Sequence, residues 1–429
     1  MTQRRILAIL DVNPFPSTDG STYPIEGQLR GLAEHWGIDI LEVHRAAVKS
    51  RFETETHREI ANHVFRVDAK TARSSRKRAS DELLFGRPFF VEPTISVKEM
   101  ASVLGSNHYD VVYTSPNVLA NWAVCAAEAL QTRPKLVLNL NDSITDRFRR
   151  DFDLFRRRVL SFKLSCKHLV QSIRASYMAR LEQRLLQPFD AILVQTEKDA
   201  EYIRRDCGND IGRKLVLAPN GLKESLLQIP YQQADRQRLI HIGSLARNRG
   251  ELVFWFLENV FRQVKSELPG LTIGLVGSVS DRDRKRLERM PGVELMGFVD
   301  DLAAALGEAT MSIAPLFMRS GLVNKMLDSM AAGVPCSGAR VFNGFPGFEN
   351  GVHGFDVESA SEWRDVLTKT LQNPEQLRDV SEAGRKLVSE NLRWSQTVQR
   401  IHESLLRLVE ESDVPANRTN LASTKLQQA

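Results

Sequence analysis

The chain has 429 residues, of which 42% are hydrophobic and 26% are charged, and its net charge at pH 7 is +5. These proportions are typical of soluble globular proteins and exclude collagen-like, largely disordered and multi-span membrane classes. The first 215 residues carry a net charge of +6 and the remainder −1, so the basic character lies in the first half.

The first half of the chain alternates predicted strands and helices. The predicted strands are short apolar runs at 5–10, 38–43, 111–113, 136–140 and 191–194. A polar loop with Gly20 and a helical pattern over 25–36 connect the first two, and an arginine-rich helical region separates the last two. Residues 45–88 show no pattern that predicts an element, and we interpret His57 and His63 there as surface residues.

A second alternating series follows. Its predicted strands lie at 214–219, 239–243, 271–276, 293–296 and 311–316, with a helix around 254–256. Two successive series of this kind predict a two-domain α/β protein with doubly wound parallel sheets, divided within the polar stretch 220–238. Because ligands of such sheets bind beyond the carboxyl ends of the strands, we expect the site in the cleft between the domains.

Targeting and membrane segments are not predicted. The apolar run near the N-terminus ends at Asp11 after five residues, which is too short for the core of a signal peptide. The longest uncharged apolar stretch, 111–127, contains Pro116 and is better interpreted as strand, loop and helix than as a membrane span. Four distant cysteines without a C-x-x-C pair indicate neither a zinc site nor a disulfide framework and fit a reducing cytosol.

Several common motifs are absent. No G-x-G-x-x-G or G-x-x-x-x-G-K-[ST] occurs, which disfavours dinucleotide-dependent and P-loop enzymes. The sequence Asp281-Arg-Asp283 matches a D-x-D metal motif, but Ser280 precedes it at the spacing of a helix cap. We therefore interpret it as a cap.

The segment 319–335 has the features of a phosphate-binding loop that leads into a helix. A glycine-bearing loop at a helix N-terminus presents backbone N–H groups and the positive end of the helix dipole, which suit a diphosphate. Lys325 adds a positive charge, and the carboxylate of Asp328 could accept hydrogen bonds from ribose hydroxyls. An ordinary amphipathic helix with a capping loop is the alternative interpretation.

This segment resembles the nucleotide-sugar signature of retaining glycosyltransferases of family 4, whose pattern is E-x7-E followed by A-M-A-x-G-x-P. Asp328 stands at the second glutamate, Ser320 at the first, and Met330-Ala-Ala-Gly-Val-Pro335 matches the remainder. The segment from Gly321 to Asp328 is similar to a subgroup with the pattern G-x-x-N-K-x-L-E.

Other motifs of that family occur in the same order. Ala218-Pro-Asn-Gly-Leu222 resembles its turn between domains, and Gly243 to Gly250 resembles G-R-L-x-x-x-K-G, with Ser244 at the arginine and Arg249 at the lysine. Gly297-Phe-Val-Asp-Asp301 resembles the nucleobase loop, and Asn391-Leu-Arg-Trp394 resembles the F-S-W segment before the last helix. In the first half, Gly20 stands at the family's glycine loop and Asn141-Asp142 at its H-D pair.

The resemblance implies a GT-B fold, in which two Rossmann-like domains face an interdomain cleft. Residues 1–215 would form an acceptor-binding domain and 216–395 a nucleotide-sugar-binding domain. Residues 396–411 would form a helix that packs back on the first domain, and 412–429 a disordered tail. The implied catalytic residues are Arg249, Lys325, Asn141 and Asp142. The implied donor-binding residues are Gly20, Gly243, Ser244, Phe298, Val299, Ser320, Gly321, Leu322, Val323 and Asp328.

The implied reaction is transfer of a sugar from a nucleoside-diphosphate sugar to a hydroxyl group, without a metal or another cofactor. The basic segments 66–78 and 147–184 fit an acceptor on an anionic membrane, such as a lipid-linked saccharide in bacterial surface polysaccharide synthesis. A cytoplasmic protein, peripheral on the inner face of the plasma membrane, is therefore expected. A GT-B nucleotide-sugar epimerase and a non-catalytic binding or scaffold protein remain alternatives. Nucleic acid is not expected, since the arginines lack interleaved aromatic residues.

Overall fold

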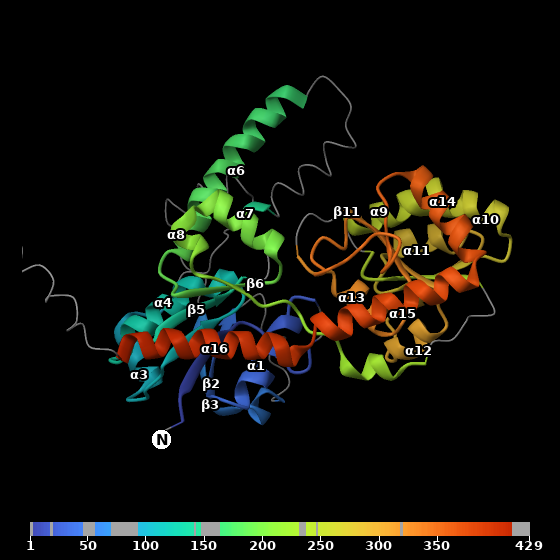
Figure 1. The fold of residues 1–429 in the computed structure, drawn as a ribbon. Coiled ribbons are helices and arrows are strands. Elements are labelled where there is room, and N and C mark those ends of the chain that lie inside the picture. Colours follow the sequence, from blue (N-terminus) through green and yellow to red (C-terminus); the bar gives the residue numbers. More distant parts are fainter. Residues whose placement is uncertain are drawn as a thin grey trace, which may run out of the picture.

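The chain folds into two α/β domains that lie side by side (Figure 1). The computed structural model describes residues 3–17, 20–45, 56–69, 93–140, 143–146, 164–230, 237–245, 248–317 and 321–413. Both sheets are parallel throughout, so the predicted α/β architecture of two doubly wound sheets is confirmed.

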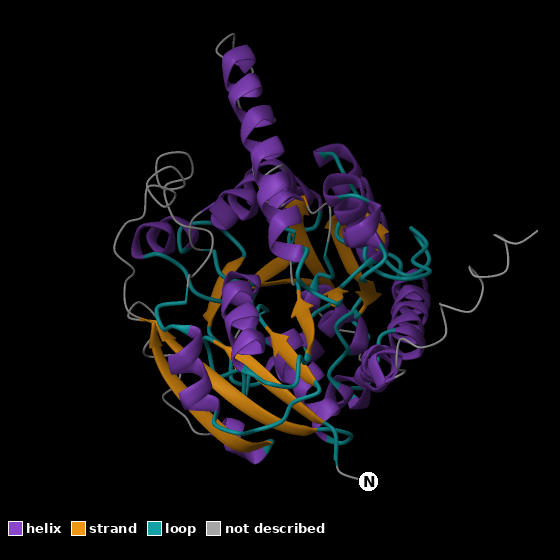
Figure 2. Cartoon of the chain, turned by 90° about the vertical axis from the view of Figure 1, so that its left-hand side faces the viewer, coloured by secondary structure: helices purple, strands orange, loops and turns teal. Residues whose placement is uncertain are grey.

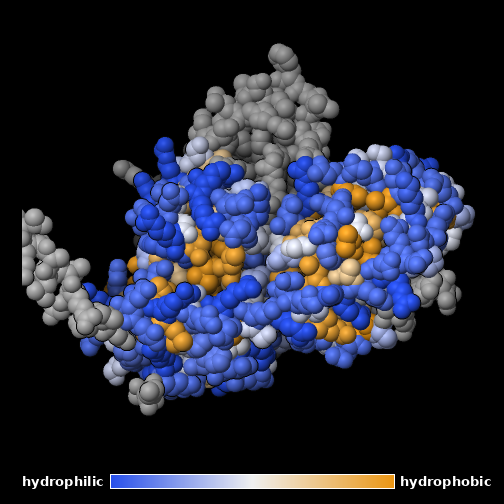
Figure 3. Space-filling model, viewed as in Figure 1, coloured by the Kyte–Doolittle hydropathy of each residue, from blue (hydrophilic) through white to orange (hydrophobic). Residues whose placement is uncertain are grey.

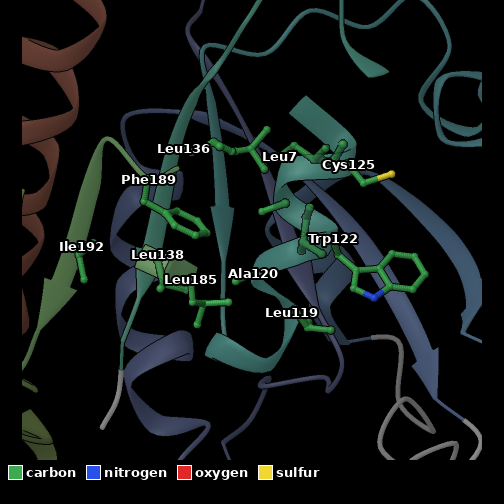
Figure 4. Packing of buried hydrophobic residues seen from close by; sticks show 14 of the residues in the cluster. Leu7, Leu119, Ala120, Trp122, Cys125, Leu136, Leu138, Leu185, Phe189 and Ile192 are labelled. Carbon is green, nitrogen blue, oxygen red and sulfur yellow. The ribbon is translucent and has the colours of Figure 1, made fainter. Parts of the chain in front are cut away.

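The first domain is built on seven parallel strands in the order β3-β2-β1-β4-β5-β6-β7 within the described ranges. Their bounds are β1 (Arg5–Leu10), β2 (Gly37–Arg45), β3 (Ala61–Ala69), β4 (Val111–Thr114), β5 (Lys135–Asn139), β6 (Ala191–Val194) and β7 (Leu215–Leu217). The central strands are apolar and buried because helices cover both faces of the sheet. Trp122 and Phe189 fill one side of the core beside Leu7 and Leu138 (Figure 4).

The helices of the first domain connect these strands. They are α1 (Tyr23–Ala33), α3 (Val97–Leu104), α4 (Ala120–Ala129), α6 (Leu164–Leu186), α7 (Glu197–Cys207) and α8 (Asn209–Gly212), with short 3-10 helices η2 (Thr56–Glu59) and η3 (Asn117–Leu119). The stretch 111–127 is strand, loop and helix, as predicted. In the described part of the chain, no helix combines the length and the apolar character needed to cross a membrane. Helix α6 projects from the body of the domain (Figures 1 and 2).

Three features of the first domain differ from the sequence-based expectation. Strand β7 was expected to start the second series, but it pairs with β6 and closes the first sheet. Strand β3 lies in the segment without a predicted element, because as an exposed edge strand it needs no continuous apolar run. His57, expected at the surface, is 2% exposed, and its Nε2 lies 2.9 Å from Oε1 of the buried Glu42. The carboxylate of Glu42 on β2 gives the buried imidazole a polar neighbour.

The second domain contains six parallel strands in the order β10-β9-β8-β11-β12-β13, counted over the described residues. Their bounds are β8 (Arg238–Ile242), β9 (Thr272–Val276), β10 (Val293–Gly297), β11 (Met311–Phe317), β12 (Cys336–Ala339) and β13 (Phe355–Asp356). The helices are α9 (Asn248–Phe256), α10 (Arg262–Glu267), α11 (Asp281–Leu287), α12 (Leu302–Gly307), α13 (Asn324–Ala331), α14 (Ala360–Leu371) and α15 (Pro374–Asn391). A π-helical turn η5 (Leu257–Phe261) joins α9 to α10, and a 3-10 helix η4 (Glu224–Gln228) precedes β8.

The two aspartates of the D-x-D sequence, Asp281 and Asp283, lie in the first turn of α11. The Ser280 hydroxyl accepts a hydrogen bond from the backbone N–H of Asp283 at the first turn of α11. This arrangement satisfies an N–H group that has no partner inside the helix, so the interpretation as a cap is confirmed.

The last helix, α16 (Trp394–Asp413), returns from the second domain to the first and lies along it (Figure 1). Ile401, Leu405 and Val409 recur at helical spacing and are buried in the core of the first domain. The surface around this helix is mostly hydrophilic, with separate hydrophobic patches on each domain (Figure 3). The chain therefore crosses between the domains twice, once before β8 and once before α16.

Trp394 sits where these two crossings meet. A Cβ atom at Gly27 of α1 would lie 2.3 Å from the Trp394 indole, and one at Gly221 would lie 2.4 Å from its Cγ and its backbone N. The Tyr23 ring packs against the same indole, with 5.5 Å between the centroids. The two glycines thus let α1 and the segment between β7 and β8, called the connecting segment below, approach the indole more closely than any residue with a side chain could.

We expect Gly27→Ala to lower the free energy of unfolding by about 1–3 kcal/mol, because the added methyl group overpacks a rigid aromatic ring. The matched control is Gly307→Ala at the end of α12, where a Cβ atom would meet nothing within 4 Å. Alanine is the better helix former, so the control should be neutral or slightly stabilising. Urea unfolding of both variants measures the difference, and equal stabilities would contradict the described packing.

Candidate functional site between the two domains

The predicted site residues that the structure describes lie beyond the carboxyl ends of strands in both domains. Gly20 stands in the connection from β1 to α1, and Gly243 and Ser244 follow β8. Phe298 and Val299 follow β10. Gly321 to Val323, which the resemblance assigns to donor binding and which are called the donor loop below, lead into α13, which carries Lys325 and Asp328. Parallel strands bring these segments to one edge of each sheet.

Some predicted residues fall outside the described parts of the chain. Asn141, Asp142 and Ser320 are among the residues without a described placement. Arg249 lies in the first turn of α9, but its side chain is not described. The described part of the site therefore consists of the other residues.

The start of α13 offers a site for an anion. Its N-cap residue, Val323, provides no side-chain cap, so the positive end of the helix is not neutralised there by its own cap. Lys325 lies in the first turn, and a Cβ atom at Gly243 would be 3.2 Å from its Nζ. From the first domain, Gly20 reaches the same place, because its Cβ position is 3.6 Å from Asn324 Nδ2. Residues of both domains therefore lie next to the start of α13.

Glycines make room for the Lys325 ammonium group. Gly243 has a φ angle of +142° and Gly277 one of +128°, in the region that favours glycine. A Cβ atom at Gly277 would lie 2.5 Å from the carbonyl oxygen of Gly243. The ends of β8 and β9 therefore approach each other because Gly277 lacks a side chain, and the missing side chain at Gly243 leaves room for the Lys325 ammonium group.

His241 is a buried neutral neighbour of Lys325. Its Nδ1 lies 3.1 Å from the carbonyl oxygen of Ile313. Since a carbonyl oxygen only accepts, the proton is on Nδ1, and Nε2 faces Gly243 and Lys325. Burial, reinforced by the Lys325 charge, lowers the pKa of His241 to about 3. The imidazole therefore adds no second positive charge next to Lys325.

Asp328 lies one turn further along α13 and is almost fully buried, with 7% of its surface exposed. Its Oδ2 accepts a hydrogen bond of 3.3 Å from Lys223 Nζ, whereas Oδ1 is buried without a hydrogen-bond partner among the described residues. Burial raises the pKa of Asp328, and Lys223 opposes this shift. An unpaired buried carboxylate oxygen is costly unless a ligand donates to it.

The loop after β10, which the resemblance assigns to the nucleobase, is open to solvent. Phe298 is 84% exposed, while Val299 packs at the edge of the core. Ser244 lies across from the loop after β9, with 2.7 Å between its Oγ and Ser278 Oγ. An exposed aromatic side chain such as Phe298 offers a flat apolar face.

The donor loop differs from the expectation that its N–H groups are free for a diphosphate. The Gly321 N–H donates to Asp199 Oδ1 at 3.1 Å, and the Leu322 N–H donates to Gln195 Oε1 at 3.4 Å. Both acceptors belong to the first domain. Two of the expected anion contacts are thus already occupied by side chains.

The contributions of Asp199, Gln195, Lys223 and His241 were missed in the sequence analysis. Thr196 and Asp199 stand three residues apart, which is the spacing of a helix cap, and the cap is indeed present. That spacing does not indicate that Asp199 Oδ1 accepts a hydrogen bond from Gly321 in the other domain. His241 and Lys223 lie within or beside motifs, but only the fold shows which way their side chains point.

Residues 236–373 match a family model described as "Glycosyl transferases group 1". This match covers most of the second domain, including β8 to β11 and α13. No curated protein sequence matches the chain.

Solved structures resemble nearly the whole chain. Anabaena Alr3699/HepE in complex with UDP has a TM-score of 0.65 at 14% identity, covering 94% of this chain and 100% of that one. Sucrose-phosphate synthase from Thermosynechococcus elongatus has a TM-score of 0.66 at 17% identity, with 95% and 100% covered. The pneumococcal O-GlcNAc transferase GtfA has a TM-score of 0.61 at 11% identity, with the same coverage. The fold is therefore that of the GT-B glycosyltransferases.

Replacement of His241 by glutamine tests its neutrality. The native state resists protonation of His241 down to pH 3, whereas the unfolded chain takes up the proton near pH 6.5, so this group destabilises the fold as pH falls through that window. The stability advantage of the wild type over His241→Gln should fall by about 1 kcal/mol between pH 7 and pH 5.5. A difference independent of pH in urea unfolding would show that the imidazole titrates normally.

Proposed function

We propose that the chain is a glycosyltransferase that uses a nucleoside-diphosphate sugar and transfers its sugar to a hydroxyl group. The observation that carries this proposal is the uncapped start of α13, with Lys325 in its first turn and Gly243 and Gly20 against it. The family-model match and the GT-B fold support it. Similar structures that hold UDP or UDP-glucose also support it.

The diphosphate would bind at the start of α13. As the glycosidic bond breaks, negative charge develops on the leaving diphosphate, and the Lys325 ammonium group and the helix terminus stabilise it. His241 stays neutral, so it does not compete with Lys325 for that charge. By the resemblance, Arg249 adds a second cation. Positive side chains would thus do the work of charge neutralisation, and we propose no metal or other cofactor.

The nucleoside would extend along the second domain. A ribose hydroxyl donating to Oδ1 of Asp328 would satisfy the buried oxygen that has no partner among the described residues. The base would lie against the loop with Phe298 and Val299, near Ser244. We keep Ser320, Asn141 and Asp142 as donor or catalytic residues on the resemblance alone.

The finer assignment follows the same resemblance. We propose a retaining reaction of the family 4 type, with a lipid-linked saccharide as the acceptor at the first domain. The basic segments of that domain would favour an anionic membrane surface, on the cytoplasmic side, in bacterial surface polysaccharide synthesis. A nucleotide-sugar epimerase would convert the donor unaided, whereas a transferase requires an acceptor. Incubation of UDP-sugars without an acceptor separates the two activities.

Lys325→Ala should lower turnover by about 10²- to 10³-fold, the typical effect of removing one group that stabilises transition-state charge. The matched control is Lys369→Ala on the exposed face of α14, which should retain full activity. Release of UDP from a UDP-sugar in the presence of acceptors measures both variants. The proposed role of Lys325 fails if the two variants are equally active. By the resemblance, Arg249→Ala should behave like Lys325→Ala.

Asp328→Asn should weaken UDP binding by about tenfold, because an amide replaces one of the two carboxylate oxygens and the charge. Asp365→Asn on the exposed face of α14 is the control and should bind UDP like the wild type. Thermal unfolding with increasing UDP reports the affinity, since a ligand of the folded state raises its stability. Unchanged affinity in Asp328→Asn would remove Asp328 from the ribose site. A wild-type protein that UDP, GDP and their sugars all fail to stabilise would be a scaffold.

A further inference from the structure

The amino end of α7 in the first domain contacts the donor loop of the second domain. Asp199 Oδ1 accepts from the Gly321 N–H at 3.1 Å, and Gln195 Oε1 accepts from the Leu322 N–H at 3.4 Å. Both side chains are buried, with 5% and 8% of their surfaces exposed. These contacts are separate from the packing around Trp394.

We propose that Asp199 and Gln195 form a closure latch, which holds the donor loop against the first domain. Asp199 is a positioning residue in this proposal: it fixes the loop from which α13 starts, and thereby the place of Lys325 opposite Gly20. The latch goes beyond the proposed transfer reaction, because it concerns what holds the two domains together at the loop and not the transfer step.

Asp199 is held in the orientation that the latch needs. Thr196 Oγ1 donates to Asp199 Oδ2 at 2.6 Å and accepts from the Asp199 backbone N–H at 3.0 Å. With Oδ2 used in this way, Oδ1 is directed at Gly321. A carboxylate accepting from a buried N–H is a charge-assisted hydrogen bond, stronger than one between neutral groups. The side chain therefore needs no rearrangement to bind the loop.

The shape of the second domain fits this contact. A Cβ atom at Gly344, in the loop after β12, would lie 2.7 Å from Thr196 Cγ2 and 2.8 Å from the carbonyl oxygen of Gly321. Gly344 thus allows Thr196 to approach the donor loop. Any larger residue there would push α7 and the loop apart.

The latch also changes where an anion can bind. Because the first two N–H groups of the donor loop are used by the first domain, the groups left for a diphosphate are those at the start of α13 itself. Loop closure and anion binding then use different N–H groups of one segment. The two can therefore occur together instead of competing.

The chain contains a matched control for Asp199. Ser280 and Asp283 form the same cap at the start of α11, with Ser280 Oγ donating to Asp283 Oδ2 at 2.7 Å. The structure shows no contact of Asp283 with the first domain among the described residues. Asp283→Ala thus removes the same hydrogen bond from a cap hydroxyl to a carboxylate, without touching the latch.

Amide hydrogen exchange of the full chain without nucleotide tests the proposal. In Asp199→Ala, exchange in the peptide that contains Gly321 and Leu322 should be faster by about tenfold or more, because the closed population falls. Asp283→Ala should leave this peptide unchanged. Exchange within α7 serves as the fold control, and the loop should accelerate more than α7 does. Equal exchange of the loop in both variants would overturn the latch.

Two further variants separate the latch from a general loss of structure. Asp199→Asn keeps an oxygen acceptor without the charge, so exchange should fall between that of the wild type and Asp199→Ala. Gly344→Val should force the contact open and increase the radius of gyration in small-angle X-ray scattering. Gly270→Val, where a Cβ atom would meet nothing within 4 Å, is its control. The same radius of gyration for both glycine variants would count against the latch.

Discussion

The relative position of the two domains depends on the enclosure of one indole. Trp394 is the first residue of α16, and it lies between Gly27 of α1 and Gly221 of the connecting segment. The Tyr23 hydroxyl donates to the Gly221 carbonyl oxygen at 2.8 Å and fixes this segment from the other side. Both covalent connections between the domains thus pass through one packed cluster. The packing of this cluster therefore fixes how the two domains face each other across the site.

The electrostatics of the site follow from burial. Lys325 is half-buried beside His241, and burial, reinforced by the Lys325 charge, keeps the imidazole neutral. One turn further along α13, Lys223 compensates for the buried carboxylate of Asp328 and also lies over the Tyr23 ring, 5.4 Å from its centroid. Lys223 therefore links Asp328 to the cluster around Trp394. The same Lys223 side chain thus contacts Asp328 in the site and Tyr23 beside the connecting segment.

The architecture could be predicted from the sequence because buried parallel strands are continuous apolar runs. Strands such as β1 and β6 have no exposed positions to interrupt the pattern. The edge strand β3 has mixed exposure and gave no such signal, and β7 was assigned to the wrong sheet because three residues carry no information about their partner. His57 was misplaced for a related reason. Its burial depends on Glu42, which belongs to another strand.

The site could be predicted only as far as local motifs specify it. The motif around α13 indicates which segment binds an anion, because a helix terminus and a lysine are local features. It does not indicate that Asp199 and Gln195, more than a hundred residues earlier, occupy two of its N–H groups. Each buried N–H group needs one acceptor, so a group bonded to the first domain is lost to a ligand. The number of N–H groups left for the diphosphate is therefore set by the contact between the domains and not by the motif.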